Sequence, residues 1–187
     1  MYPDLKGKTA IVTGSGKKTG IGCAIARKLA GSGADIIIAD LGEPESQNAD
    51  GQVRTATGDE MQAIAAEISE SFAVRCESTP LDVTDKASIS ALASFAERRF
   101  ETIDILCNNA GASFGVPCDV ANYDESAWMK TIDINLHGVF RVSRSLIPLL
   151  KKAGGGSIIN TASRAGKVPP LFNGAYAVAK AGGIMLT

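Results

Sequence analysis

A glycine-rich turn between an apolar segment and an alanine-rich segment constrains the fold of this chain more than any other feature. Residues 8–13 form a short β-branched run that predicts a fully buried strand. The run stops at Gly14, and a helix is expected over residues 20–30. Glycines let a backbone turn sharply and approach a pyrophosphate, to which the first N–H groups of a helix can donate. The turn is either a dinucleotide-binding element or an ordinary connection, and the strand–turn–helix order favours the first.

Further apolar segments alternate with helical ones along the rest of the chain. Strands are expected over residues 34–40, 74–81, 103–107 and 157–161. Helices are expected over residues 59–71, over 85–99 with Thr84 as N-cap, over 124–151, and around Tyr176 and Lys180. The polar residues 41–58 predict a long loop. This alternation predicts an α/β fold, a three-layer, doubly wound parallel sheet of the Rossmann type, in a single domain of residues 1–187.

Residues with distinctive chemistry stand where the predicted strands end. These residues are Gly14, Asp40, Asp82, Asn109 and Ser163. Open parallel sheets bind ligands beyond the carboxyl ends of their strands. We therefore expect these residues to contribute to one ligand site.

Composition and charge exclude several other classes of function. The formal net charge of −1 gives no electrostatic reason to bind nucleic acid or an anionic membrane surface. One histidine and four scattered cysteines, with no C-x-x-C pair, argue against a metal site and for a reducing compartment. The first residues lack the apolar stretch of a secretory signal, and no apolar run is long enough to span a bilayer. We therefore expect a cytoplasmic location, no membrane and no nucleic acid partner.

The residues that would lie near the adenosine of a bound dinucleotide favour NAD as the cofactor. Asp40 ends the second predicted strand about 20 positions past the glycine turn, where a carboxylate would bind ribose hydroxyls and repel a 2′-phosphate. Lys17 and Lys18 could attract that phosphate, which favours NADP. We give Asp40 more weight because a carboxylate beside a phosphate is a direct penalty. Asp82 has two readings that stay open, a helix-starting residue or a ligand of the adenine amino group.

Ser163, Tyr176 and Lys180 form a candidate proton-transfer group. Tyr176 and Lys180 are four residues apart and share one face of a helix. A phenol with its usual pKa near 10 is too weak an acid or base at neutral pH, and a nearby ammonium lowers that pKa. A serine hydroxyl can hold a substrate oxygen against the phenol. The alternative is a strand-end serine beside a helix with a packed tyrosine and a surface lysine.

The remaining polar residues of interest are three asparagines, which can be functional or structural, and one histidine. Asn108 and Asn109 precede two small residues, which suits a close approach to a ligand, although asparagine side chains there can also bind strand backbone. Asn135 lies within a predicted helix, where asparagine is a poor helix former, so it is either functional or simply packed or solvated. His137 is isolated, and we expect it to be structural.

Together these motifs resemble the short-chain dehydrogenase/reductase family over nearly the whole chain. The matching residues are Thr13-Gly14 through Gly20-Ile21-Gly22, Asp40, Asp82-Val83, Asn108-Asn109-Ala110-Gly111, Asn135, Ser163 and Tyr176-x-x-x-Lys180. The resemblance implies catalytic roles for Ser163, Tyr176, Lys180 and Asn135, with Tyr176 as general acid/base and Asn135 holding a water. It implies that the cofactor is bound by Gly14, Ser15, Gly20, Ile21, Gly22, Asp40, Asp82, Val83, Asn109, Ala110, Gly111, Tyr176 and Lys180, with no metal.

The function that the resemblance implies is an NAD-linked interconversion of a secondary alcohol and a ketone. The alternatives are an NADP-dependent 3-oxoacyl reductase and a non-catalytic nucleotide-binding protein on the same fold. The expected partners are a small alcohol or ketone and further copies of the chain, in a tetramer or dimer formed through the helix of residues 124–151.

The sequence departs from the family pattern in three places. Five residues separate Gly14 from Gly20, where the family usually has three between its first two key glycines, so the turn is enlarged. Ala162 stands where a second serine is common. The sequence ends at Thr187, inside the helix of Tyr176 and Lys180. We therefore expect this chain to be part of a longer or truncated protein that lacks the usual C-terminal strands.

Overall fold

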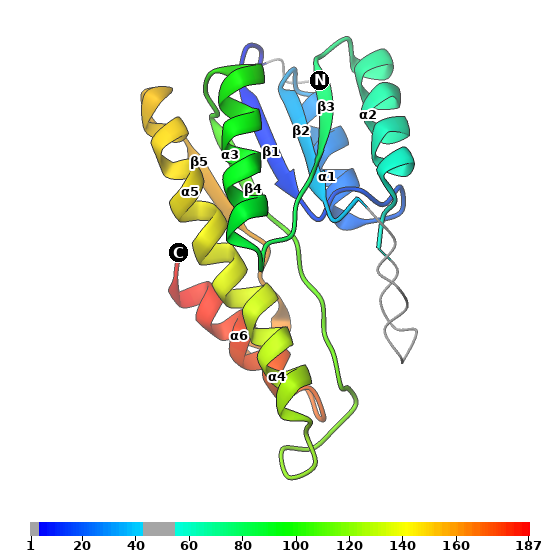
Figure 1. The fold of residues 1–187 in the computed structure, drawn as a ribbon, viewed down its shortest axis with the longest axis vertical. Coiled ribbons are helices and arrows are strands. Elements are labelled where there is room, and N and C mark those ends of the chain that lie inside the picture. The colour runs from blue at the N-terminus through cyan, green and yellow to red at the C-terminus, as the bar shows by residue number, and fades with distance from the viewer. Residues whose placement is uncertain (1–3, 43–54) are drawn as a thin grey trace.

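A parallel sheet of five strands lies at the centre of the computed structural model, which describes residues 4–42 and 55–187 (Figure 1). The strand order is β3-β2-β1-β4-β5. The strands are β1 Thr9–Thr13, β2 Asp35–Asp40, β3 Cys76–Pro80, β4 Ile105–Asn108 and β5 Ser157–Asn160. Because β1 pairs with β2 on one side and β4 on the other, the chain order reverses at β1. The predicted doubly wound parallel sheet is confirmed, and β1 and β4 form its topological switch point.

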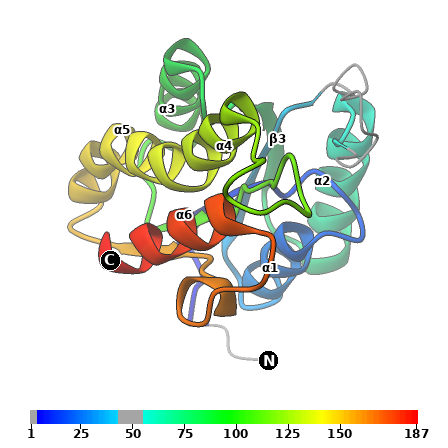
Figure 2. The ribbon, with the colours of Figure 1, turned by 90° about the horizontal axis from the view of Figure 1, so that it is seen from below.

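Helices cover both faces of the sheet. They are α1 Ile21–Ala30, α2 Gly58–Phe72, α3 Lys86–Phe100, α4 Glu125–Ile132, α5 Gly138–Lys152 and α6 Gly174–Met185. A π-helical segment, η1 Asp133–His137, joins α4 to α5, and a 3₁₀ turn, η2 Arg164–Gly166, precedes α6. Helices α1 and α2 lie on one face and α3 and α5 on the other, as the view in Figure 2 shows.

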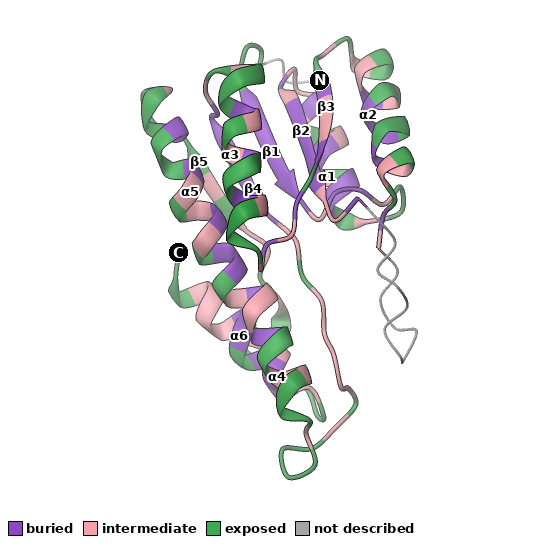
Figure 3. Cartoon of the chain, viewed as in Figure 1, coloured by how far each residue is buried: buried purple, intermediate pink, exposed green. Residues whose placement is uncertain are grey.

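Alternating side chains of the central strands build one apolar core on each face of the sheet. In β1, Ala10 and Val12 pack toward α1 and α2, whereas Ile11 packs toward α3 and α5. In β2, Ile36 and Ile38 face the first pair of helices and Ile37 faces the second. The central strands are therefore buried on both sides (Figure 3), as the continuous apolar runs predict.

The N-cap of α3 is Asp85, so the prediction of Thr84 was wrong. The carboxylate of Asp85 accepts the N–H groups of Ala87 (3.0 Å) and Ser88 (3.1 Å). The hydroxyl of Thr84 donates instead to Asp82 Oδ1. Aspartate and threonine both suit an N-cap, and the bond to Asp82 places Thr84 one residue outside the helix.

The predicted continuous helix over residues 124–151 is interrupted by η1, which is another correction. Asn135 lies in η1, and its amide Nδ2 donates to the carbonyl oxygen of Thr131 at 2.8 Å. A side chain that binds a carbonyl oxygen of the preceding turn competes with the backbone N–H groups for that oxygen. Such competition accompanies the change from α-helical to π-helical hydrogen bonding in η1. Because π-helical turns occur frequently at functional sites, the position of Asn135 in η1 favours a functional role for this residue.

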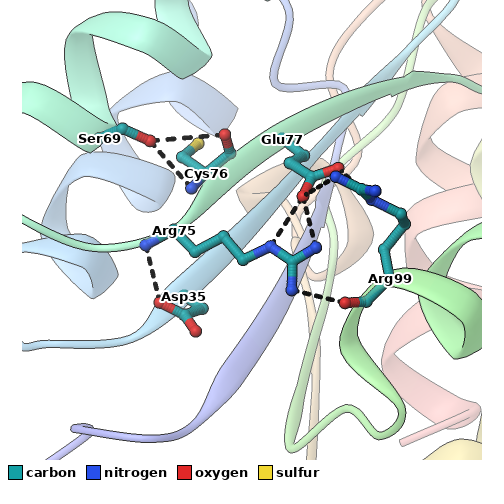
Figure 4. A network of polar contacts seen from close by, with 6 residues as sticks. All are labelled: Asp35, Ser69, Arg75, Cys76, Glu77 and Arg99. Atoms are coloured by element: carbon teal, nitrogen blue, oxygen red, sulfur yellow. Dashed lines mark hydrogen bonds and ion pairs between the residues drawn. The ribbon is translucent and has the colours of Figure 1, made fainter.

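A network of charged side chains ties β2, β3 and α3 together at the amino end of the sheet (Figure 4). Glu77 accepts from Arg75 Nε (2.7 Å) and Arg99 Nε (2.8 Å). The backbone N–H of Arg75 donates to Asp35. The guanidinium of Arg75 also stacks on the Phe100 ring at 4.2 Å. These contacts stabilise the amino end of the sheet, which is opposite to the carboxyl ends of the strands where a ligand is expected.

Most of the predicted loop over residues 41–58 lies outside the described residues, since those numbered 43–54 are not described. Among residues 4–42 and 55–187, no helix combines the length and the apolar character needed to cross a membrane. No cluster of metal-ligating side chains is found within these same ranges.

Candidate active site

The glycine turn after β1 packs too closely for side chains at its key positions. Gly14 has φ of +65°, and a Cβ built on it would lie 2.7 Å from the Cα of Ala110. A Cβ on Gly22 would lie 2.3 Å from the carbonyl oxygen of Gly14. The turn therefore presses directly against the start of α1 and the end of β4. This is the packing that lets the backbone approach a ligand at the switch point.

Asn109 and Thr13 hold the ends of β1 and β4 together. The Asn109 amide donates to the carbonyl oxygens of Thr13 and Gly14, each at 3.0 Å. The Thr13 hydroxyl accepts the N–H groups of Asn109 and Ala110, each at 3.0 Å. The structural reading of Asn109 therefore holds, and Asn109 also lines the cleft described below. Thr13 was missed as a site-positioning residue, although its place directly before Gly14 could have indicated it.

The side chain of Ser15 points into the sheet and not toward the ligand-binding edge. Its hydroxyl is fully buried, donates to the carbonyl oxygen of Val12 (2.6 Å) and accepts from the N–H of Ala39 (3.2 Å). Ser15 thus braces β1 against β2. Any contribution of its side chain to a cofactor site is indirect, through the shape of the turn.

Asp40 stands at the end of β2 with its carboxylate beside the glycine turn. One carboxylate oxygen accepts the N–H of Gly16 at 2.8 Å, and the other accepts the N–H of Leu41 at 2.9 Å. Each carboxylate oxygen has a further lone pair, so Asp40 can still bind hydroxyl groups. Lys18 forms an ion pair with Glu67 on α2 at 3.2 Å.

Asp82 stabilises the turn that leads from β3 into α3, and it also borders the cleft. Its Oδ1 accepts both the N–H (2.8 Å) and the hydroxyl (2.7 Å) of Thr84. Asp82 and Val83 line the cleft. The local turn uses one carboxylate oxygen, and these bonds leave Oδ2 for a ligand.

Lys180 is a buried amine next to the ring of Tyr176. The side chain of Lys180 is 5% exposed, and its Nζ donates to the carbonyl oxygen of Thr161 at 2.7 Å. Burial lowers the pKa of this amine from its usual value. Nζ lies 5.6 Å from the centroid of the Tyr176 ring, because the two residues occupy successive turns of α6. Thr161, which follows β5 directly, was not found from the sequence.

Asn135 brings an unpaired acceptor to the same place. The residue is 1% exposed, and its Nδ2 donates to the carbonyl oxygens of Ala112 and Thr131. Its Oδ1 is buried and has no hydrogen-bond partner among the described residues. A Cβ built on Gly111 would lie 2.7 Å from this Oδ1 and 3.7 Å from Lys180 Nζ. A buried unpaired carbonyl beside an amine is a place where a water is expected.

One cleft of about 670 Å³ brings together most of the predicted residues. The predicted residues that line it are Gly14, Gly20, Ile21, Asp40, Asp82, Val83, Asn109, Ala110, Gly111, Tyr176 and Lys180. Ser15, Gly22, Asn135 and Ser163 are not part of this lining. Ser163 is the N-cap of η2, and its Oγ accepts the N–H of Ala165 at 3.2 Å. The same cleft is lined by Asp40 after β2 and by Asn173 and Tyr176 at the start of α6.

Comparison with protein families and curated sequences gives consistent matches. Residues 8–187 match the family model described as short chain dehydrogenase. A D-beta-hydroxybutyrate dehydrogenase of Rhizobium meliloti (strain 1021) is 37% identical over 180 residues, which cover 96% of this chain and 63% of the relative. A 7alpha-hydroxysteroid dehydrogenase of Escherichia coli (strain K12) is 34% identical over 177 residues, with coverage of 95% and 61%.

Solved structures match over the same extent. An NAD+-bound xylitol dehydrogenase superposes with a TM-score of 0.83 at 30% identity, covering 98% of this chain and 63% of that one. A carveol dehydrogenase from Mycobacterium avium in complex with NAD gives a TM-score of 0.86 at 29% identity, with coverage of 97% and 64%. The present chain thus spans less than two thirds of the length of these relatives.

Proposed function

The chain belongs to the short-chain dehydrogenase family, and we propose that it is an NAD-dependent oxidoreductase that interconverts a secondary alcohol and a ketone. The observation that carries this proposal is that Tyr176 and Lys180 line the same cleft as the glycine turn and Asp40. The relatives named as dehydrogenases of hydroxy compounds support the reaction class. The two similar structures that hold NAD support the cofactor.

The residues of the cleft fit a dinucleotide with an unmodified adenosine ribose. The glycine turn leaves no space for a Cβ at Gly14 or Gly22, so the backbone itself borders the position of a pyrophosphate. Asp40 supplies acceptors for ribose hydroxyls and a negative charge that opposes a 2′-phosphate. Lys18 is paired with Glu67, which weakens the case for NADP, whereas Lys17 lines the cleft and keeps NADP as the alternative to be measured. The volume of about 670 Å³ is in the usual range for a cofactor site.

The residues at the Tyr176 end would manage the proton of the reaction. When bound, NAD would accept the hydride from the carbinol carbon. Tyr176 would take the proton of the substrate hydroxyl, and the Lys180 ammonium would stabilise the phenolate from which it starts. The unpaired Oδ1 of Asn135 would hold a water beside Lys180 and so connect this pair to solvent.

We also propose that Ser163 binds the substrate oxygen. Its Oγ accepts the Ala165 N–H, so its own proton is available to donate to a substrate. Ser163 lies on the segment between β5 and α6; Thr161 on the same segment and Tyr176 on α6 both line the cleft. The Ser163 role can be tested separately, because Ser163→Ala should lower kcat/KM without changing the affinity for NADH.

The decisive experiment compares the wild-type protein with Tyr176→Phe. NAD+ reduction is followed at 340 nm with a panel of secondary alcohols, and NADH and NADPH binding are measured by fluorescence titration. We expect the variant to lose at least about 100-fold in kcat, the contribution of a general acid/base, while its NADH affinity stays within about twofold. Turnover that survives the substitution would refute the role of Tyr176. Tighter binding of NADPH than NADH would refute the choice of NAD.

We further propose that copies of the chain associate through the α4–α5 face. Met129, Phe140 and Ile147 on these helices are exposed apolar side chains, 55%, 46% and 36% exposed. Three such side chains along one helical stretch form the kind of apolar stripe that an interface covers. Light scattering coupled to size-exclusion chromatography measures the assembly, and a monomer at micromolar concentration would contradict it.

A further inference from the structure

Asn173 precedes α6 but does not cap it. An asparagine at this position ordinarily accepts an N–H of the first helical turn with its side-chain oxygen. No such bond forms here. Instead Asn173 Oδ1 accepts the hydroxyl proton of Ser113 at 3.0 Å. Because Ser113 belongs to the segment after β4, this bond joins that segment to the start of α6, and both residues line the cleft.

The backbone around Asn173 is held in an unfavourable conformation. Phe172 has φ of +59°, which is rare for a bulky residue and costs about 1–3 kcal/mol. Its carbonyl oxygen accepts the N–H of Cys118 at 2.9 Å, and an isolated parallel β-bridge joins Cys118 to Asn173. The fold therefore fixes Asn173 with strain and forgoes a helix cap. Strain of this kind is typically retained where a side chain must point into a site.

The Ser113–Asn173 pair presents a defined set of hydrogen-bonding groups. The serine proton is used on Asn173 Oδ1, which orients the amide. That bond leaves the two N–H donors of Asn173 Nδ2 and a lone pair of Ser113 Oγ for the cleft. Asn173 directly precedes α6, Tyr176 lies three residues later in its first turn, and both side chains line the cleft.

We infer that the Ser113–Asn173 pair binds a second oxygen of the substrate, one or two carbons from the carbinol that Tyr176 deprotonates. The substrate class is then an alcohol with a further hydroxyl or carboxylate oxygen, and not a simple secondary alcohol. The inference rests on the proposed function for the reacting carbinol. The N–H donors of Asn173 suit either source of that second oxygen, and the experiment separates the two.

The test uses three substrates that share a CH₃–CHOH group. These are 2-butanol, 2,3-butanediol and 3-hydroxybutyrate, each assayed with NAD+. We expect the wild-type kcat/KM for at least one oxygenated substrate to exceed that for 2-butanol by about tenfold or more, the value of one good hydrogen bond. A preference for the diol identifies a hydroxyl as the bound group, and a preference for the hydroxy acid identifies a carboxylate.

Variants then assign this preference to the pair. Ser113→Ala and Asn173→Ala should bring the ratio of the two kcat/KM values to within about threefold of unity. Asn173→Asp keeps the acceptor for Ser113 but removes the donors, so it should lose the preference as well and additionally repel 3-hydroxybutyrate. Ser113→Thr keeps the hydroxyl and should retain the preference. Ser90→Ala and Asn122→Ala change exposed residues outside the cleft and serve as matched controls.

The single tryptophan gives a readout that does not depend on turnover. The ring of Trp128 lies 3.4 Å from a Cβ built on Gly174, the residue after Asn173. Its emission should therefore respond when a ligand binds beside Asn173 in the Tyr176→Phe variant loaded with NAD+. We expect the same tenfold preference in the dissociation constants, and its loss in Tyr176→Phe proteins that also carry Ser113→Ala.

The outcomes separate the inference from the proposed function. If no alcohol is turned over but the fluorescence titration shows the preference and its loss in the variants, the proposed reaction fails and the binding pair stands. If turnover occurs but the ratio of kcat/KM is the same in the wild-type protein, Ser113→Ala and Asn173→Ala, the inference is overturned and the reaction stands. A wild-type protein that neither binds nor prefers any oxygenated ligand overturns the inference as well.

Discussion

The replacement of Gly22 by alanine tests the packing of the glycine turn. A Cβ at this position would lie 2.3 Å from the Gly14 carbonyl oxygen and 2.7 Å from Asn109 Nδ2. The first atom belongs to the backbone, and the second is fixed by its bonds to the carbonyl oxygens of Thr13 and Gly14. Neither can rotate away, so α1 must move from β1 and the Asn109–Gly14 bond must lengthen or break.

The size of the effect follows from three contributions. Overpacking a close contact costs about 1–3 kcal/mol, and the disturbed hydrogen bond costs about another 1 kcal/mol. Alanine gains at most about 1 kcal/mol over glycine as a helix former. We therefore expect Gly22→Ala to lower the free energy of unfolding by about 1–3 kcal/mol. Because α1 borders the cleft, the affinity for NADH should fall by about tenfold or more.

Gly183 is the matched control, since it also lies in a helix. A Cβ built on Gly183 has no neighbouring atom within 4 Å, and its φ is not in the left-handed region. Gly183→Ala should therefore have the opposite sign and stabilise the protein by about 0.5–1 kcal/mol, with unchanged NADH binding. Urea denaturation and NADH fluorescence titration of the two variants measure both effects. If Gly22→Ala is as stable as Gly183→Ala and binds NADH as tightly as the wild-type protein, the close packing inferred for the turn is refuted.

Two further predictions concern charged residues. Asp40→Ala removes the acceptor of the Gly16 N–H and the charge that opposes a 2′-phosphate, so the ratio of the NADP+ to the NAD+ dissociation constant should fall at least about tenfold; an unchanged ratio would remove Asp40 as the selector. Glu77→Gln should lower the free energy of unfolding by under about 1 kcal/mol at pH 7, because the network in Figure 4 is partly exposed to solvent. The hydrogen bond from Arg99 lowers the pKa of Glu77 below its usual value, so this stabilisation is complete above that usual pKa of about 4.3 and is lost as the pH falls through the lowered one. Urea denaturation at several pH values should therefore show the two proteins converging at acidic pH, and a constant difference would contradict the assignment.

The arrangement of the strands could be predicted because it depends on local periodicity and on a general rule of connection. Short apolar runs separated by helices permit essentially one architecture, a parallel sheet with helices on both faces. That architecture alone places the residues after each strand at the same edge. Asp40, Asp82 and Asn109 therefore line one cleft although up to 69 positions separate them in the sequence.

The direction of individual side chains could not be predicted in the same way, because it depends on partners that are distant in sequence. Ser15 stands in the glycine turn, yet its hydroxyl binds Val12 and Ala39 inside the sheet. Thr84 and Asp85 are both good N-caps, and the nearby Asp82 decides between them.

Asn135 and Asn173 show how such distant partners create the site itself. By helix propensity alone, Asn135 is a poor helix former and Asn173 is an ordinary helix cap. In the structure the Asn135 amide binds Ala112, and the Asn173 oxygen binds Ser113, both in the segment that follows β4. Asn135, which binds Ala112, therefore lies in a π-helical turn, and Asn173, which binds Ser113, does not cap α6. Asn135 thereby brings its unpaired oxygen to Gly111 near Lys180, and Asn173 lines the cleft together with Tyr176, so both departures from helix propensity lie near the groups to which we assign the reaction.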